Sequence, residues 1–480
     1  MADATFNGAF INGQWTDAPA DLNVANPGTG GTAGSVSSCK AVDANAALDA
    51  AAAAAKGWGA ASLVHREAAI QKYKSALLAK KDRIIELLVA ETGKVNGNAE
   101  YDFNMLVDCL QFHCEEMKRA YGTVFPSPDG AALSYSRNLP VGVVVAVLTW
   151  NFPLLNLGYK LGPILASGCT CVIKPSEETP LATSLALELT AGCLPDGVVN
   201  LVNGTGIDLV EPLCASKIPR LLTTIGSTVM GRRMIAYGAT SIKRFSLELG
   251  GDAPVLVFGD AKLDEAVADI IGLKYGNGGQ ICVSPNRVFV ERPIYDAFLE
   301  KAVALSKTYE YGTGGFAPGA GKDVLQPVVS AAAVERLHGL VKDAEVKGAR
   351  VLCGGKPVAG KDGFFFEATV LADVKPGMNC TGCEIFGPIL SVQPFDDHDA
   401  VFSAANDTDY GLSGYVYTTS LDTMLRAENE LQCGNVLING VHYSIELPHG
   451  GVKQSGCGKD ISHLALRDYL DVRRISIKRA

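Results

Sequence analysis

The stretch VGVVVAVLT, residues 141–149, begins a series of short apolar segments that decide the fold. Segments of the same kind follow at TCVIKP (170–175), VVNLVN (198–203), RLLTTI (220–225) and FSLELGG (245–251), with helical stretches between many of them. Short apolar runs that alternate with helices are typical of a parallel sheet covered by helices. The chain is therefore predicted to be an α/β protein.

A second series of such segments begins near Asp252. It contains NRVFVE (286–291), ARVLCGG (349–355), ILSVQPF (389–395) and GYVYT (414–418), again with helical stretches between them. A chain of 480 residues is too long for one ordinary hydrophobic core. Two α/β units are the simplest interpretation.

The segments outside these two series have other patterns. Asp43 can cap a helix over the alanine-rich run that follows it, and residues 65–92 carry apolar side chains at helical spacing. Residues 122–140 contain the turn signal SPDG between alternating residues, and 472–480 also read as a strand. Such peripheral strands leave open edges in a monomer, so we expect a homodimer or homotetramer.

Composition argues against several classes of partner and site. The formal net charge of −9 is unsuited to a nucleic-acid surface. A basic, apolar leader and a long apolar run are both missing, so no membrane partner is expected and a cytoplasmic location is predicted. The 13 cysteines are scattered as in a reducing compartment. Cys380 and Cys383 form a lone C-x-x-C, and no metal site is expected.

Two local motifs suggest chemistry without deciding it. GSTVMG (226–231) follows an apolar run and precedes a helical one, so the helix N-terminus could bind a pyrophosphate through backbone N–H groups, although G-x-G-x-x-G is absent. Cys282 follows the glycine pair Gly278–Gly279, where a tight backbone could present a thiol to a cleft. A buried structural cysteine is the alternative interpretation for any one of the thirteen.

Seven motifs in order resemble those of the aldehyde dehydrogenase superfamily: TWNFP (149–153), VIKPSEETP (172–180), GSTVMG (226–231), LELGG (247–251), GQIC (279–282), EIFGP (384–388) and PHGGVKQSGCGKD (448–460). The resemblance extends from FINGQW, near residue 10, to the last strand. It implies a Rossmann-type NAD-binding domain (1–121 and 141–250), an α/β catalytic domain (251–446) and a small β oligomerisation arm with bridging segments (122–140 and 447–480).

The resemblance also implies a covalent mechanism. Cys282 would attack the aldehyde to form a thiohemiacetal and then a thioester, and the Asn151 amide with the Cys282 backbone N–H would stabilise the oxyanion. Glu248 would be the base that activates water, which disfavours transfer to coenzyme A. Lys160 belongs to the same catalytic set. Asp471 stands where some relatives carry a proton-relaying glutamate, but its shorter side chain weakens that role.

The cofactor implied by the resemblance is NAD. Glu177 would accept hydrogen bonds from the ribose and repel the 2′-phosphate of NADP, which leaves NADP as the less favoured alternative. The residues expected to bind the cofactor are Thr149, Trp150, Lys174, Ser176, Glu177, Gly226, Ser227, Leu249, Glu384 and Phe386.

The substrate is expected to be an aliphatic, amino- or aromatic aldehyde. The wall of its funnel would be formed by Met105, Phe152, Leu155, Tyr159, Ile281, Val283, Tyr443 and His449. The segment PHGG around His449 resembles that of family members that act on ω-aminoaldehydes. Succinic semialdehyde dehydrogenases, by contrast, carry arginines where Tyr159 and Gly276 stand. A succinic or related semialdehyde is the alternative substrate. A non-catalytic binding protein on the same fold is a third hypothesis, and the joint presence of Cys282, Glu248 and Asn151 counts against it.

Overall fold

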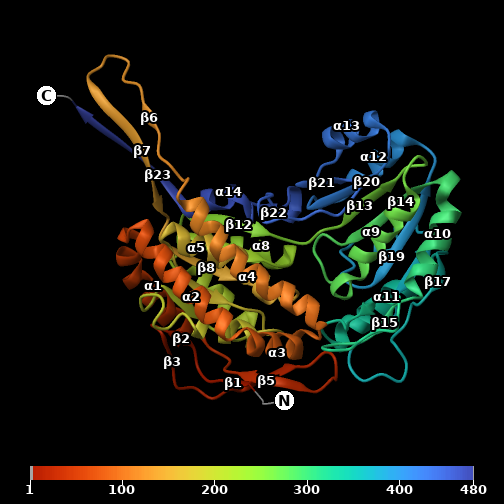
Figure 1. Ribbon diagram of the computed structural model, residues 1–480, viewed down its shortest axis with the longest axis horizontal. Coiled ribbons are helices and arrows are strands. Elements are labelled where there is room, and N and C mark those ends of the chain that lie inside the picture. Colours follow the sequence, from red (N-terminus) through yellow and green to blue (C-terminus); the bar gives the residue numbers. More distant parts are fainter. Residues whose placement is uncertain (1–3, 479–480) are drawn as a thin grey trace.

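The computed structural model describes residues 4–478, without the side chain of residue 207. Figure 1 shows two sheets side by side and a narrow arm that leaves the body beside the C-terminus. The first sheet runs in the order β22-β12-β11-β8-β9-β10-β2-β3, in which β22 is the two-residue strand Gly456–Cys457. Its parallel centre consists of β8 (Val143–Val147), β9 (Thr170–Lys174), β10 (Val199–Leu201), β11 (Leu221–Ile225) and β12 (Arg244–Glu248).

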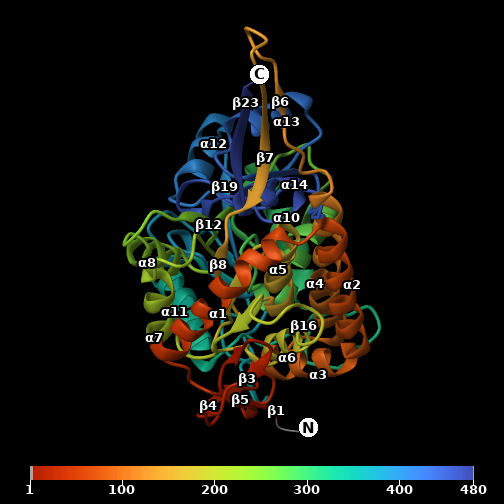
Figure 2. The same cartoon turned by 90° about the vertical axis from the view of Figure 1, so that its left-hand side faces the viewer.

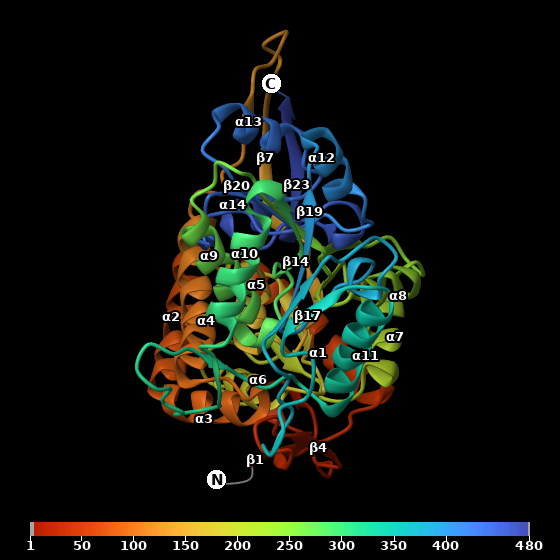
Figure 3. The ribbon, with the colours of Figure 1, turned by 90° about the vertical axis from the view of Figure 1, so that its right-hand side faces the viewer.

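The second sheet faces the viewer in Figure 3. Its order is β17-β18-β19-β14-β13-β20-β21, and β17 is antiparallel to its neighbour while the other pairs are parallel. The strands are β13 (Ala253–Val257), β14 (Pro285–Glu291), β17 (Arg350–Cys353), β18 (Thr369–Ala372), β19 (Ile389–Phe395), β20 (Ser413–Tyr417) and β21 (Asn435–Ile438). The two predicted α/β series thus form separate sheets. The domain boundary at residues 250 and 251 falls between β12 and β13 and stays a prediction.

Helices cover both sheets. Around the first sheet lie α1 (Ala41–Ala60), α2 (Leu63–Ala79), α3 (Lys81–Thr92), α4 (Asn96–Met117), α5 (Pro153–Ser167), α6 (Leu181–Glu188), α7 (Gly206–Ala215) and α8 (Thr228–Gly238). Around the second lie α9 (Leu263–Tyr275), α10 (Arg292–Ser306), α11 (Ala331–Val346), α12 (His398–Asn406) and α13 (Leu421–Glu430). The short α14 (Ser462–Ala465) follows near the C-terminus.

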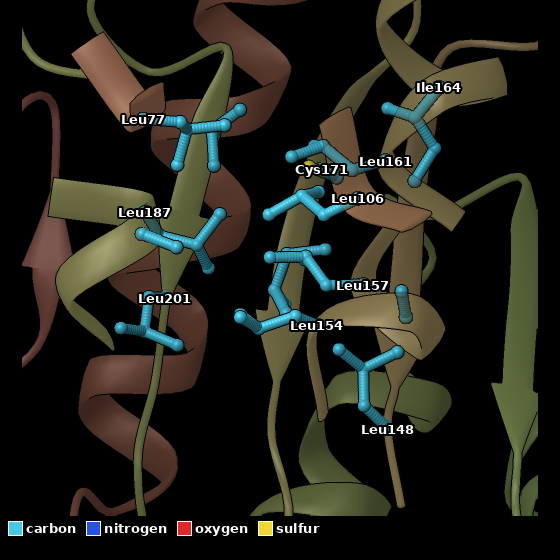
Figure 4. Packing of buried hydrophobic residues seen from close by; sticks show 14 of the residues in the cluster. Leu77, Leu106, Leu148, Leu154, Leu157, Leu161, Ile164, Cys171, Leu187 and Leu201 are labelled. Atoms are coloured by element: carbon cyan, nitrogen blue, oxygen red, sulfur yellow. The ribbon is translucent and has the colours of Figure 1, made fainter. Parts of the chain in front are cut away.

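Helix α5 is central to the first unit because it begins beside TWNFP and is buried along most of its length. Figure 4 shows its side chains Leu154, Leu157 and Leu161 packed among residues of α4 and β9. Gly158 allows α4 to come close, since a Cβ there would lie 2.8 Å from the Leu106 Cα. The dense packing on both sides holds the start of α5 in one place.

The N-terminal region departs from the prediction in three ways. Residues 4–36 form short strands that the sequence did not indicate: β1 (Ala4–Phe6), β4 (Leu22–Ala25) and β5 (Thr32–Val36) make a small sheet, while β2 (Phe10–Ile11) and β3 (Gln14–Trp15) extend the first sheet. Asp43 is not the cap residue, because α1 begins at Ala41 and the Asp43 carboxylate accepts the Lys40 N–H at 2.8 Å. The helical pattern over 65–92 divides at Lys80 into α2 and α3.

The arm is a three-stranded antiparallel ribbon of β6 (Val124–Phe125), β7 (Ala132–Pro140) and β23 (Leu470–Lys478). It projects from the body in Figures 1 and 2, and its exposed apolar side chains include Leu133, Val472 and Ile477. The predicted strands are confirmed in 122–140 and in 472–478, and residues 479–480 of the second prediction lie outside the described residues. The homodimer or homotetramer stays a prediction. No helix in residues 4–478 is long and apolar enough to cross a membrane.

Candidate active site

A pocket of about 250 Å³ lies where the carboxyl ends of β8, β11 and β12 face the second sheet. Parallel strands bring their carboxyl ends to the same edge of a sheet, so loops distant in sequence meet there. The pocket brings together many of the predicted site residues, namely Thr149, Trp150, Asn151, Gly226, Ser227, Glu248, Cys282, Glu384 and Phe386.

The backbone before Cys282 has an unusual conformation. Between α9 and Cys282 the short 3₁₀ turn η1 (Gly276–Gly279) contains φ angles of 50° at Asn277, 65° at Gly278 and 77° at Gly279. A Cβ on Gly279 would lie 2.2 Å from the backbone of Gly387. Only glycine fits there, so the Gly-Gly pair is required by the loop that presents the thiol.

The loops around LELGG and GQIC are also packed backbone against backbone. A Cβ on Gly251 would lie 2.3 Å from the carbonyl oxygen of Cys282. Since the first motif ends β12 of one sheet and the second precedes β14 of the other, this contact joins the two sheets at Cys282.

Asn151 is buried and its amide orientation is determined by neighbours. Its Nδ2 donates to the carbonyl oxygen of Gln280 at 3.0 Å, and its Oδ1 accepts from the Asn156 amide at 3.2 Å. The Asn277 amide donates to the Asn151 carbonyl at 2.9 Å. One N–H of Asn151 is thus used by the loop before Cys282, and the second is left for a ligand in the pocket.

Cys282 and Glu248 are in contact. Cys282 is partly exposed in the pocket, whereas Glu248 is 3% exposed at the end of β12. Desolvation, followed by the negative charge of the nearby Glu248 carboxylate, raises the pKa of Cys282 well above its ordinary value. The thiol is therefore protonated at neutral pH, and its activation requires a base.

Lys160 lies at 0% exposure and its Nζ is 2.6 Å from Oδ1 of Asp460. Asp460 was not predicted, because it follows PHGGVKQSGCGK as an ordinary acidic residue and only the folded chain brings it to Lys160. Asp471 lies on β23, where its half-exposed carboxylate is 2.6 Å from Arg244. This position counts against a proton relay through Asp471 and indicates Asp460 as the carboxylate beside the site.

The predicted cofactor residues form a strip from β9 to the pocket. Lys174 Nζ is 2.7 Å from Glu177, whose pKa is raised by desolvation but lowered overall by this lysine. Ser227 caps α8 by accepting the N–H of Met230. Ser176 is nearly buried beside Glu177, and Leu249 packs against Gly231 of α8 so closely that a Cβ there would lie 2.6 Å from it.

At the other end of the strip, Trp150 meets Phe386 edge to face, with ring centroids 5.2 Å apart. Glu384 accepts the backbone N–H of Gly251 at 3.1 Å, and burial raises the pKa of Glu384 to about 8. Arg336 also lines the pocket and donates to the carbonyl of Ile385 at 2.6 Å. Arg336 is a single arginine on α11 outside any motif, so its place in the pocket could not be predicted from the sequence.

The predicted substrate wall is partly assembled around His449. Its ring lies 6.3 Å from that of Tyr159 and 6.1 Å from that of Tyr443, and the Tyr443 hydroxyl is 2.8 Å from that of Tyr415. Leu155 and Val283 are buried, while the side chains of Met105, Phe152 and Ile281 are partly exposed. Lys94 lies over the Phe152 ring at 4.0 Å and pairs with buried Asp102. The wall is aromatic and apolar.

Two unusual features of the sequence have clear roles in the structure. Asp252, which directly follows LELGG, forms a buried ion pair with Arg287 at 2.9 Å and accepts a hydrogen bond from Asn286. Cys380 and Cys383 are free thiols, and the Cys383 Sγ donates to the Asn379 carbonyl at 3.1 Å. Over the described residues, neither belongs to a group of possible metal ligands.

Comparison with known proteins agrees with this geometry. A model described as "Aldehyde dehydrogenase family" matches residues 15–475. A probable succinate-semialdehyde dehydrogenase [NADP(+)] of Sinorhizobium fredii is 39% identical over 95% of this chain and 92% of that protein. A glutarate-semialdehyde dehydrogenase of Pseudomonas putida is 36% identical over 98% and 97%. The crystal structure of an aldehyde dehydrogenase from Brucella melitensis biovar abortus superposes with a TM-score of 0.94 at 35% identity, covering 99% of this chain and 98% of that one.

The glycine loop before the thiol gives a first prediction. Gly279→Ala should lower the free energy of unfolding by about 1–3 kcal/mol or more, because the new Cβ strains a left-handed residue and meets Gly387. It should also slow alkylation of Cys282 by iodoacetamide. Denaturant unfolding and mass spectrometry measure the two effects. Gly57→Ala in α1, which meets open space, is the control and should be stabilising by up to about 1 kcal/mol. Equal stability of both variants would contradict the prediction.

Proposed function

Because the chain belongs to the aldehyde dehydrogenase family, we propose that it oxidises an aldehyde to a carboxylic acid through a thioester on Cys282. The observation that carries the proposal is the meeting of Cys282, Glu248 and Asn151 at one pocket between the two sheets. A non-catalytic protein on this fold would not need a nucleophile, a base and an oxyanion donor together.

The first step is activation of the thiol. Since its pKa is raised, Cys282 holds its proton until Glu248, which has a carboxylate oxygen within 4.8 Å of the thiol sulfur, removes it. The thiolate sulfur then bonds to the carbonyl carbon, and the π electrons of the carbonyl move to its oxygen. The product is a thiohemiacetal anion.

The oxyanion is stabilised by donors that are already in position. The free N–H of Asn151 and the backbone N–H of Cys282 are the donors, and the hydrogen bonds from Asn156 and to Gln280 keep the Asn151 amide from turning away. Donors that need no reorganisation stabilise the developing charge better than water does.

NAD(P) fits the strip of residues beside this centre, and when bound it supplies the acceptor for the hydride that leaves the tetrahedral carbon. The first turn of α8, capped by Ser227, would hold the pyrophosphate. Lys174 and Glu177 would contact the adenosine ribose, while Trp150, Glu384 and Phe386 would border the nicotinamide side. The Gly231 contact with Leu249 supports the fit, because it keeps α8 close to the end of β12.

Hydrolysis completes the reaction. Once the proton taken from the thiol has been released to solvent, the Glu248 carboxylate takes a proton from water, the hydroxide attacks the thioester carbon, and the C–S bond breaks to return the Cys282 thiolate. This second use of Glu248 favours water over coenzyme A as the acyl acceptor.

Variants of the two reacting residues test the proposal. Cys282→Ala should reduce NADH or NADPH formation by about a thousandfold or more. Glu248→Gln should give a stoichiometric burst followed by slow turnover, because water is a weaker acid than a thiol and depends more on the base. Stopped-flow absorbance measures both. Cys457→Ala, which removes an exposed thiol, is the control and should keep full activity. Full turnover by Cys282→Ala would refute the nucleophile.

We infer a preference for NAD over NADP from Glu177. Its carboxylate suits ribose hydroxyls and opposes a 2′-phosphate, although the Sinorhizobium fredii relative is named for NADP(+). Glu177→Gln should raise the ratio of kcat/KM for NADP to that for NAD by about tenfold. Steady-state kinetics with both cofactors measure the ratio, and Glu178→Gln is the matched control. An unchanged ratio in Glu177→Gln would argue that another residue selects the cofactor.

For the substrate we propose an aliphatic, amino- or aromatic aldehyde without a far carboxylate. The aromatic group of Tyr159, Tyr443 and His449 suits an apolar chain or, by cation–π contact, an amine. The relatives named for succinate and glutarate semialdehydes favour the alternative. A carboxylate tail, however, needs a cationic partner, and Tyr159 and Gly276 provide none.

The proposed substrate preference predicts the effect of introducing arginines at positions 159 and 276. Wild type should have a higher kcat/KM for 4-aminobutyraldehyde or benzaldehyde than for succinic semialdehyde. Tyr159→Arg with Gly276→Arg should reverse that order by about tenfold or more, because each arginine offers the carboxylate a charged donor. A Cβ at Gly276 meets only Ile281, at 3.5 Å, so the loop admits a side chain. Gly272→Arg, at an exposed position of α9, is the control. A wild type that prefers succinic semialdehyde would establish the alternative.

A further inference from the structure

Cys282, Glu248 and His449 come from three separate segments and converge on one point. A Cys Sγ, a carboxylate oxygen and an imidazole nitrogen of these residues all lie within 4.8 Å of one another. His449 Nε2 is 3.3 Å from Oε1 of Glu248. Neither Glu248 nor His449 is more than 8% exposed.

The carboxylate in this cluster has an unused oxygen. Oε1 of Glu248 is buried and has no hydrogen-bond partner, although His449 is near. A buried acceptor without a donor is unfavourable by about 1–3 kcal/mol. A ligand that binds this oxygen would relieve that penalty.

The three atom types form a set that suits zinc. Zn²⁺ takes thiolate, imidazole and carboxylate ligands in a tetrahedron, with bonds of about 2.0–2.3 Å. Such bonds put a nitrogen and an oxygen ligand about 3.3 Å apart, which matches the His449–Glu248 distance. The sulfur needs to lie about 3.6 Å from each of the others, and it is already within 4.8 Å of both.

His449 supplies the imidazole of this cluster and is held in place by its surroundings. Its backbone is fixed by two hydrogen bonds with Asp460, of 3.0 Å and 2.7 Å, and its ring is flanked by Tyr159 and Tyr443. A phenylalanine would leave only two ligands. Two ligands bind zinc far more weakly than three held in place.

We propose that Cys282, Glu248 and His449 form an inhibitory site for Zn²⁺ or another thiophilic divalent cation. Binding replaces the thiol proton, which is released to solvent, with a metal–sulfur bond, and water from the pocket fills the fourth position. No electron is transferred. The sequence predicts no resident metal, and this ion is an inhibitor and not a cofactor. That it inhibits rests on the proposed function, since the metal occupies both the nucleophile and the base.

Metal binding is tested apart from activity. The full-length protein, in the absence of aldehyde, is titrated with Zn²⁺ against a chromogenic chelator, and with Co²⁺ to follow thiolate-to-metal charge-transfer absorption. Wild type should bind one ion per chain with the charge-transfer band. Cys282→Ala should lose the band, and His449→Phe and His449→Gln should each weaken binding by about tenfold or more. Circular dichroism checks that each variant folds.

Matched controls separate this site from other thiols and histidines. His442→Phe, at an exposed histidine close by in sequence, and Cys457→Ala, at an exposed thiol, should leave affinity and stoichiometry unchanged. In turnover assays, each variant is compared with its own metal-free rate. Zn²⁺ should inhibit wild type reversibly, with recovery on adding chelator, and His449→Phe should need about tenfold more Zn²⁺ for the same inhibition.

The outcomes distinguish this proposal from the proposed function. Binding that both His449 variants leave unchanged, or that Cys457→Ala abolishes, overturns the zinc site. Turnover without such binding overturns it as well and leaves the dehydrogenase intact. Binding that depends on both Cys282 and His449 supports the site even in a protein that oxidises no aldehyde, and that result would refute the proposed function alone.

Discussion

The contact between the Gly251 backbone and the Cys282 carbonyl is the constraint on which the site depends. It joins the end of β12 in one sheet to the loop before β14 in the other, with no room for a side chain between them. The left-handed turn at Asn277–Gly279 then directs the chain toward the pocket. Asn277 stabilises that turn, because its amide donates to Asn151 while its oxygen accepts from Gln326 at 2.7 Å. The thiol and the oxyanion donor are thus positioned by the same few hydrogen bonds.

Buried ion pairs surround this junction. Lys160 with Asp460, Asp252 with Arg287, and Lys94 with Asp102 are each almost fully buried. Burying two charges is rarely a net gain in stability, whereas removing one partner is destabilising by about 3–5 kcal/mol. Each pair links segments that hydrophobic packing alone would allow to slide. We interpret them as devices that fix the relative position of the elements around the pocket.

Much of the fold could be predicted because each central strand is indicated by its own short run of residues. Segments such as 143–147 and 221–225 are buried on every residue, and an uninterrupted apolar run of this length between helices is characteristic of a central parallel strand. The strands in residues 4–36 could not be predicted, since strands of two to five residues carry little periodicity and form only because a partner edge exists. The same reasoning applies to Asp460. Its partner Lys160 is 300 residues away in the sequence, and a contact between residues so far apart leaves no local pattern from which it could be predicted.

The unused oxygen of Glu248 also has a consequence for catalysis. In the proposed reaction this carboxylate serves the thiol first and water later, so it has to turn between two proton donors. A carboxylate held by several hydrogen bonds would be a weaker base and would resist turning. An oxygen without a donor is unfavourable for stability, yet it preserves both basicity and motion. His449 lies close to that oxygen but outside hydrogen-bond geometry, so it does not pin the base. The cluster is therefore less stable than it would be with a fully hydrogen-bonded carboxylate. In return, the unpaired oxygen leaves Glu248 free to accept protons from both the thiol and water.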